Sequence, residues 1–262
     1  MQALARIRES LAFFKAFARP ITILVAAYVI PLVLGDALYS HFYVPPDAAR
    51  WKSWVPLAVG LFYRPFYHSC LIALLSSRET GRPFPAALWL STSLRFWGRL
   101  VAIDMVTYLS ILVAAGPAAL LSAGFTAAGG QASQTFVFLA SGLLVMAILL
   151  SLMIVARLSL ASFFAVLEDR RLKDALKLSL LLTRPLAKEI MAGAAILYLA
   201  LFTANLALGG VVALLDGNPV AAIVANLVLA VVAVIPLILF FRYYGIVKKE
   251  MPAAPLPPVE PG

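Results

Sequence analysis

The sequence predicts an all-α protein, a polytopic membrane bundle of six transmembrane helices. Two observations carry this prediction. First, 63% of the residues are hydrophobic and only 13% are charged, with a mean hydropathy of +0.97, whereas soluble proteins carry about 25% charged residues. Second, the apolar residues fall into six runs, each near the roughly 20 residues that a helix needs to cross the bilayer core. Their bounds are Ile21 to Tyr39, Trp54 to Leu75, Leu100 to Leu121, Phe136 to about Leu158, Met191 to Leu215, and Val220 to Phe241.

The polar stretch before the first run leads into a run longer than the apolar part of a signal peptide. We therefore expect a retained first span preceded by an N-terminal interfacial helix, and a single membrane domain over residues 1–245. Residues 246–262 end in PAAPLPPVEPG. This Pro-rich composition predicts a disordered cytoplasmic tail.

The fourth run continues in apolar sequence to Leu167, which makes 32 residues from Phe136. As one helix this stretch would measure about 48 Å, more than a bilayer core. Either that helix is strongly tilted or it projects into the cytoplasm.

Positive residues indicate the orientation of the spans. Of the 21 Lys and Arg, 17 lie before the first span, after the last one, or in the second and fourth connections. Cytoplasmic segments of membrane proteins collect such residues, so both termini are predicted to be cytoplasmic. The +9 net charge is explained by this bias, and we expect no nucleic-acid partner.

Two cytoplasmic amphipathic helices are expected, between spans 2 and 3 and between spans 4 and 5. Between spans 4 and 5 apolar and small residues recur at helical spacing, with cations opposite, a pattern typical of helices that lie in the membrane interface. These residues are Leu172, Ala175, Leu176, Ser179 and Leu180. Between spans 2 and 3 the matching residues are Phe84, Ala87, Leu88 and Ser91.

The same connections suggest an internal parallel repeat. The sequence Ala-Leu-x-Leu-Ser occurs at 87–91 and again at 175–179, each time after an apolar run that carries an arginine, Arg64 or Arg157. Repeats of this kind relate the halves of some transporters.

Intramembrane ionisable residues predict the candidate site. Arg64 lies about 15 Å down its span, close to the midplane, with His68 one turn deeper on the same face. Asp104 should reach a similar depth to His68 in the third span. Because charges in a bilayer face protein or water rather than lipid, we expect a cluster of Arg64, His68 and Asp104. The alternative is a buried ion pair that only holds two helices in register.

Arg157 has two interpretations. At the inner end of its span it can extend its side chain to the interface. If the repeat holds, it lines a common interior with Arg64. Asn205 and Asn226 should lie at equal depth in spans 5 and 6, and are predicted to form an interhelical hydrogen bond of roughly 0.6 kcal/mol.

The stretch RLSLASFFAVLEDRRLKDALKLSLLLTR, residues 157–184, resembles the YciC-like group of bacterial inner-membrane proteins and the related membrane domain fused to some glycerophosphodiester phosphodiesterases. The matching positions are Arg157, Leu167, Glu168, Ala175, Leu176, Ser179, Leu182, Thr183 and Arg184. The resemblance implies a location in the bacterial inner membrane and no established activity. The phosphodiesterase domain is absent, so that activity is not implied.

No catalytic motif, cofactor motif or metal-ligand set is present in the sequence, and the single Cys70 has no thiol partner. The sequence predicts a non-enzymatic accessory protein of envelope or lipid homeostasis, with membrane lipids, anionic ones included, as partners. The alternative is a transporter or channel for a lipid or a small anionic solute.

Overall fold

The computed structural model describes residues 2–42, 49–127, 134–215 and 218–250, and the regular structure in these ranges is helical. The elements are α1 (Gln2–Phe42), α2 (Ala49–Glu79), a 3-10 turn η1 (Ala86–Leu88), α3 (Trp89–Ala127), α4 (Gln134–Leu158), α5 (Ala161–Leu167), α6 (Leu172–Leu182), α7 (Ala187–Leu214), α8 (Pro219–Val232) and α9 (Val234–Glu250). The predicted tail lies largely outside the described residues.

Five stretches in the described part of the chain are long and apolar enough to cross a membrane. They contain predicted spans 3 and 6 and overlap predicted spans 1, 4 and 5. Their bounds are Gln2–Pro31, Ala86–Leu121, Phe138–Leu167, Ala187–Leu214 and Val220–Lys249. The all-helical class and the membrane character of the sequence prediction are thereby confirmed. Predicted span 2 lies in the 31-residue helix α2. In most of the first half of this helix the side chains are not among those that the structure describes.

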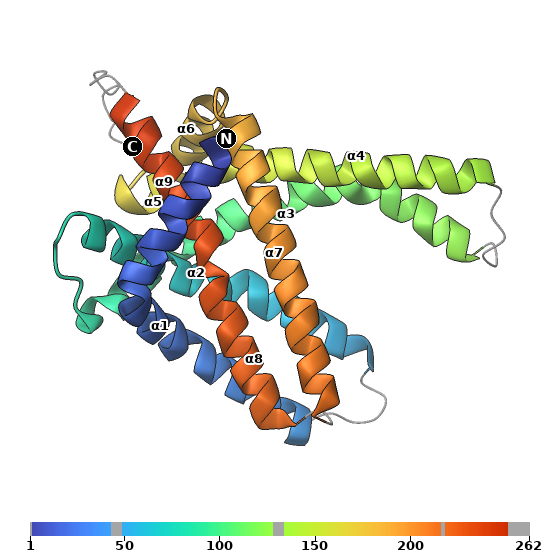
Figure 1. Ribbon diagram of the computed structural model, residues 1–262, viewed down its shortest axis with the longest axis horizontal. Helices are drawn as coiled ribbons and strands as arrows, with labels where there is room; N and C mark the ends of the chain where they lie inside the picture. Colours follow the sequence, from blue (N-terminus) through green and yellow to red (C-terminus); the bar gives the residue numbers. More distant parts are fainter. Residues whose placement is uncertain (1, 43–48, 128–133, 216–217, 251–262) are drawn as a thin grey trace.

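The helices form two arms that meet at one end of the molecule (Figure 1). The paired α3 and α4 form one arm, which projects away from α7 and α8 in the other. The buried core gathers at the junction, where the large buried side chains include Phe163, Phe164 and Tyr243. The far ends of the arms expose apolar residues such as Leu120 and Leu214. This exposure suits a lipid environment, because lipid tails are as apolar as leucine.

The fourth apolar run is not one long helix. α4 ends at Leu158 and α5 begins at Ala161, separated by a turn in which the Ser159 hydroxyl donates to the carbonyl of Ala156 at 2.9 Å. The premise that residues 136–167 form one continuous helix is therefore wrong, while the tilt of α4 in the membrane stays a prediction. The short α5 lies in the core with Phe163 and Phe164 fully buried.

A comparable break divides the last apolar stretch, where α8 ends at Val232 and α9 begins at Val234. Pro236 lies four residues after Val232. It has no N–H to bond that carbonyl, and its ring clashes with it in a regular helix. The break therefore has a local cause in the sequence.

The two predicted connecting helices differ. Between spans 4 and 5, α6 is a separate helix, with Ala175 and Ser179 buried and Lys173 and Lys177 exposed. The connection between spans 2 and 3 contains only η1, which runs directly into α3. Pro83 and Pro85 precede it, and proline disfavours helical backbone in the preceding residue. The expected separate helix between spans 2 and 3 is not seen.

The predicted repeat has no structural counterpart at its matching residues. Ala175 and Ser179 are fully buried, whereas Ala87 and Ser91, their counterparts in the first copy, are exposed. The shared five-residue pattern therefore lies in two unlike environments.

Candidate functional site

The structure brings the predicted intramembrane residues to one place between α2 and α3. Arg64 and His68 lie one turn apart on α2, and Asp104 and Tyr108 lie one turn apart on α3. The Arg64 guanidinium Nη1 donates to the Tyr108 hydroxyl at 3.0 Å. Residues one turn apart lie on the same face of a helix, so each pair presents its polar side chains together to the neighbouring helix. The hydrogen bond thus holds the Arg64 side chain against α3.

Asp104 is near Arg64 but is not bonded to it. The charges of the two side chains interact, yet no hydrogen bond or ion pair to Asp104 occurs within the described residues. The charge of Arg64 also acts on His68. The imidazole ring of His68 contacts the Tyr67 ring edge-on, with the ring centroids 5.6 Å apart. The cluster expected from the sequence is therefore present as a neighbourhood, and the simple ion pair offered as its alternative does not form.

Sequence reasoning missed a third helix in this neighbourhood. Tyr198 of α7 lies near enough for the charges of Arg64 and Asp104 to act on it, although no hydrogen bond joins it to them in the described part of the chain. A signal was available, since Tyr198 carries the only polar side-chain group in the apolar stretch AAILYLALF. Depth arguments alone could not show that α7, rather than another span, faces the cluster.

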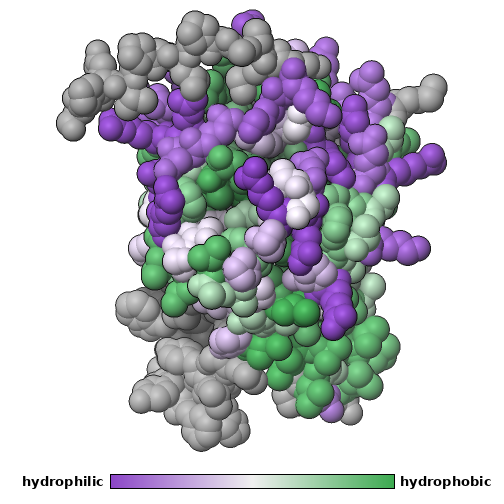
Figure 2. Space-filling model, turned by 90° about the vertical axis from the view of Figure 1, so that its left-hand side faces the viewer, coloured by the Kyte–Doolittle hydropathy of each residue, from purple (hydrophilic) through white to green (hydrophobic). Residues whose placement is uncertain are grey.

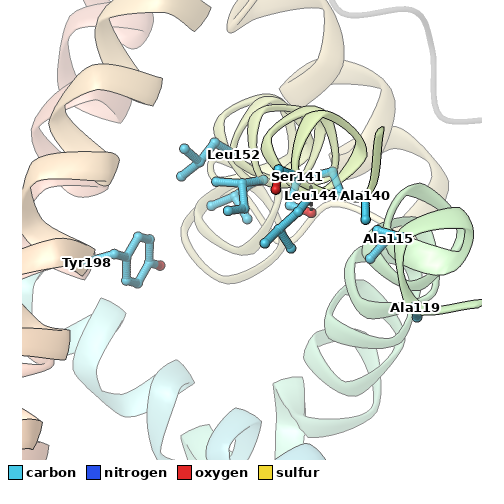
Figure 3. Close-up of a pocket in the computed structure, with 12 residues that line it drawn as sticks. Ala115, Ala119, Ala140, Ser141, Leu144, Leu152 and Tyr198 are labelled. Atoms are coloured by element: carbon cyan, nitrogen blue, oxygen red, sulfur yellow. Dashed lines mark hydrogen bonds between the residues drawn. The ribbon is translucent and has the colours of Figure 1, made fainter. Parts of the chain in front are cut away.

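Tyr198 also stands in the wall of a cavity between α3, α4 and α7 (Figure 3). The cavity has a volume of about 600 Å³, within the range of small-molecule sites. In Figure 3 Tyr198 lies across the space from Ser141, Leu144 and Leu152. The lining residues are Ala115, Ala118, Ala119, Ala140, Ser141, Leu144, Ala147, Ile148, Ser151, Leu152, Val155 and Tyr198. Tyr198 therefore stands in the wall of an apolar cavity that lies near the charged cluster.

Arg157 does not belong to this cluster. Its Nη2 donates to the carbonyl of Leu180 at 2.6 Å, in the last turn of α6. Carbonyls in the last turn of a helix have no partner within the helix and attract cations. The backbone carbonyl of Arg157 in turn accepts from Ser179 at 2.8 Å. The Thr183 hydroxyl is shared between that carbonyl, at 3.2 Å, and the carbonyl of Ser179, at 2.6 Å. Arg157 thus joins α4 to α6, and the expectation that it lines a common interior with Arg64 is not met.

Asn205 and Asn226 are not joined. Both side chains are exposed, and the structure contains no hydrogen bond between these two described residues. The predicted interhelical bond is therefore absent. Equal depth on neighbouring helices does not determine which way each side chain faces.

Two acidic residues of the stretch 157–184 are committed to contacts within the chain. Glu168 accepts a hydrogen bond from the Tyr244 hydroxyl at 2.9 Å and lies 3.7 Å from Nε of Arg170. Asp169 pairs with Arg99 and Arg95 of α3 at 2.5 Å each. The hydrogen bond from Arg99 is the largest cause that lowers the pKa of Asp169. These contacts hold the loop between α5 and α6 against its neighbours.

Together the fold and the site define an all-helical membrane protein with a polar cluster beside an apolar intramembrane cavity. Comparisons with protein families, with curated proteins and with solved structures gave no match for the chain. The residues of the site therefore carry the functional argument.

Proposed function

We propose that this chain is a six-span protein of the bacterial inner membrane, of the YciC-like type, with both termini in the cytoplasm. Helix α2, at 31 residues, is long enough for a further span beside the five apolar stretches. Hydrophilic residues gather toward one end of the face shown in Figure 2, with apolar residues below them. That separation, together with the distribution of Lys and Arg, supports cytoplasmic termini.

Within that membrane we propose a non-enzymatic role in lipid homeostasis, in which the cavity between α3, α4 and α7 binds a membrane lipid. The observation that carries this proposal is the apolar cavity with Tyr198 in its wall, near Arg64 and its hydrogen-bond partner Tyr108. A lipid matches this arrangement, because its apolar chain suits the cavity and its polar headgroup suits the cluster. Burial of an acyl chain contributes about 25 cal/mol per Å² of surface removed from water. The free energy gained is smaller when the chain comes from the bilayer, which is already apolar. Contacts to the headgroup therefore supply the selectivity.

A second candidate is a transporter or channel for a lipid or a small anionic solute. The observation that favours it is the half-buried Arg64 beside a cavity between diverging helical arms. Cationic residues inside the membrane mark substrate pathways in many transporters. The two candidates share the same binding site and differ in whether the lipid moves across the membrane.

A pair of adjacent substitutions on α4 tests the lipid-binding proposal. Ile148 lines the cavity and Leu149 does not, and they are 51% and 50% exposed. Ile148→Trp should fill the cavity and reduce the lipid retained by the full chain after extraction from nanodiscs, counted by native mass spectrometry. Leu149→Trp should leave that number unchanged. Equal retention in both variants and in the wild type would contradict the proposal.

Lipid translocation in liposomes separates the second candidate from the first. If the protein only binds lipid, fluorescent phospholipid should stay in its leaflet at the rate of protein-free vesicles. Translocation that Ile148→Trp abolishes and Leu149→Trp preserves would establish transport through this cavity.

A further inference from the structure

The polar cluster contains two opposite charges, those of Arg64 and Asp104, that do not form an ion pair with each other. Arg64 donates to Tyr108, and Asp104 lies one turn along the same helix from that tyrosine. The two charges interact, but no ion pair joins them in the described part of the chain. A positive and a negative group therefore stand side by side between α2 and α3.

Asp104 is the less satisfied of the two. Its half-buried carboxylate accepts no hydrogen bond from any described residue. Leaving a partly buried carboxylate without a donor costs free energy, and this cost falls when a cation or an N–H group approaches it. A ligand that brings only negative charge to Arg64 would leave this cost in place and add repulsion beside Asp104.

We propose that the site selects a zwitterionic aminophospholipid, an inference that rests on the lipid-binding function proposed above. The lipid phosphate lies at Arg64 and Tyr108, and its primary ammonium donates to Asp104. The apolar cavity beyond Tyr198 receives an acyl chain. A primary ammonium carries three N–H donors for the carboxylate, whereas a choline group carries none. The cluster therefore prefers ethanolamine over both choline and glycerol headgroups.

The first test uses the unmodified full chain. Nanodiscs with equal amounts of phosphatidylethanolamine, phosphatidylglycerol and phosphatidylcholine of identical acyl chains supply the lipids, and native mass spectrometry identifies those retained. Phosphatidylethanolamine should be enriched, and stepwise N-methylation of its headgroup should lower retention as N–H donors are lost. Enrichment of phosphatidylglycerol, or equal retention across the methylation series, would overturn the proposal.

Substitutions then assign the two charges. Asp104→Asn should shift the ratio of retained ethanolamine to glycerol lipid by about tenfold toward glycerol, as expected for loss of a buried charge partner. Arg64→Gln should lower retention of both lipids. Asp174→Asn, an exposed change on α6, is the matched control and should alter neither. An unchanged ratio in Asp104→Asn would overturn the role of Asp104.

The two proposals fail differently. If Ile148→Trp does not reduce retention of any lipid, the lipid-binding function itself is contradicted. If Ile148→Trp reduces retention but the headgroup preference is absent, lipid binding stands and only the zwitterion selectivity is lost.

Discussion

Asp169 shows how one residue can serve both a turn and an ion pair. Its φ of +51° is the left-handed conformation, which asparagine and aspartate adopt more readily than most residues. From that position the carboxylate reaches Arg95 and Arg99 on α3. Asparagine at 169 preserves the backbone preference and removes only the charge.

Asp169→Asn should therefore lower the free energy of unfolding at pH 7 by less than about 1 kcal/mol, because the side chains are partly exposed. The folded-state pKa of Asp169 lies below its ordinary value of 3.8. The contribution of the charge is thus present above that value and is lost as the pH falls below it. Unfolding by sodium dodecyl sulfate in mixed micelles, at pH 7 and pH 3, measures the difference from wild type. A difference that does not shrink at pH 3, or in high salt, would contradict the ion-pair explanation.

At the scale of elements, the junction of α4 and α6 decides how the core is built. The carbonyl of Arg157 accepts from the hydroxyls of Ser179 and Thr183, both fully buried. The Arg157 side chain returns a hydrogen bond to Leu180. The position of Arg157 at the end of an apolar run is therefore explained by its hydrogen bond to the carboxyl end of α6.

The double substitution of Ser179→Ala with Thr183→Val should lower the free energy of unfolding by about 1–3 kcal/mol, since it leaves a buried carbonyl without a donor. Ser91→Ala is the matched control from the first copy of the repeat pattern, where the serine is exposed and bonds only within its own turn. It should stay within about 0.5 kcal/mol of wild type. Equal effects at both positions would restore the repeat and contradict this assignment.

At the scale of the whole molecule, the position of the two termini depends on the number of spans. An even number places both ends on one side, and five spans would place them on opposite sides. The buried Cys70 is the single cysteine, so a Cys70→Ala background allows one new thiol at a time to be followed.

Cysteines introduced at Gln2 and at Lys249 should react with an impermeant maleimide only after the cells are permeabilised. A cysteine at Gln131, in the loop predicted to lie outside, should react in intact cells. Labelling is read by the mass shift of the protein on a gel. Reaction of Gln2→Cys and Lys249→Cys from opposite sides would show an odd number of spans and overturn the six-span topology.

The sequence alone determined the helical class, the membrane character and the gathering of Arg64, His68 and Asp104 between two neighbouring helices. These properties follow from the length of apolar runs and the spacing of residues along one helix, which are local. It did not determine that Tyr198 of α7 lies near the cluster, or that Asn205 and Asn226 form no hydrogen bond with each other. Nor did it determine that α4 stops at Leu158 and that Arg157 bonds α6. Those features depend on which helix faces pack together, and in an apolar environment many faces are nearly equivalent until close packing and a few polar contacts choose among them.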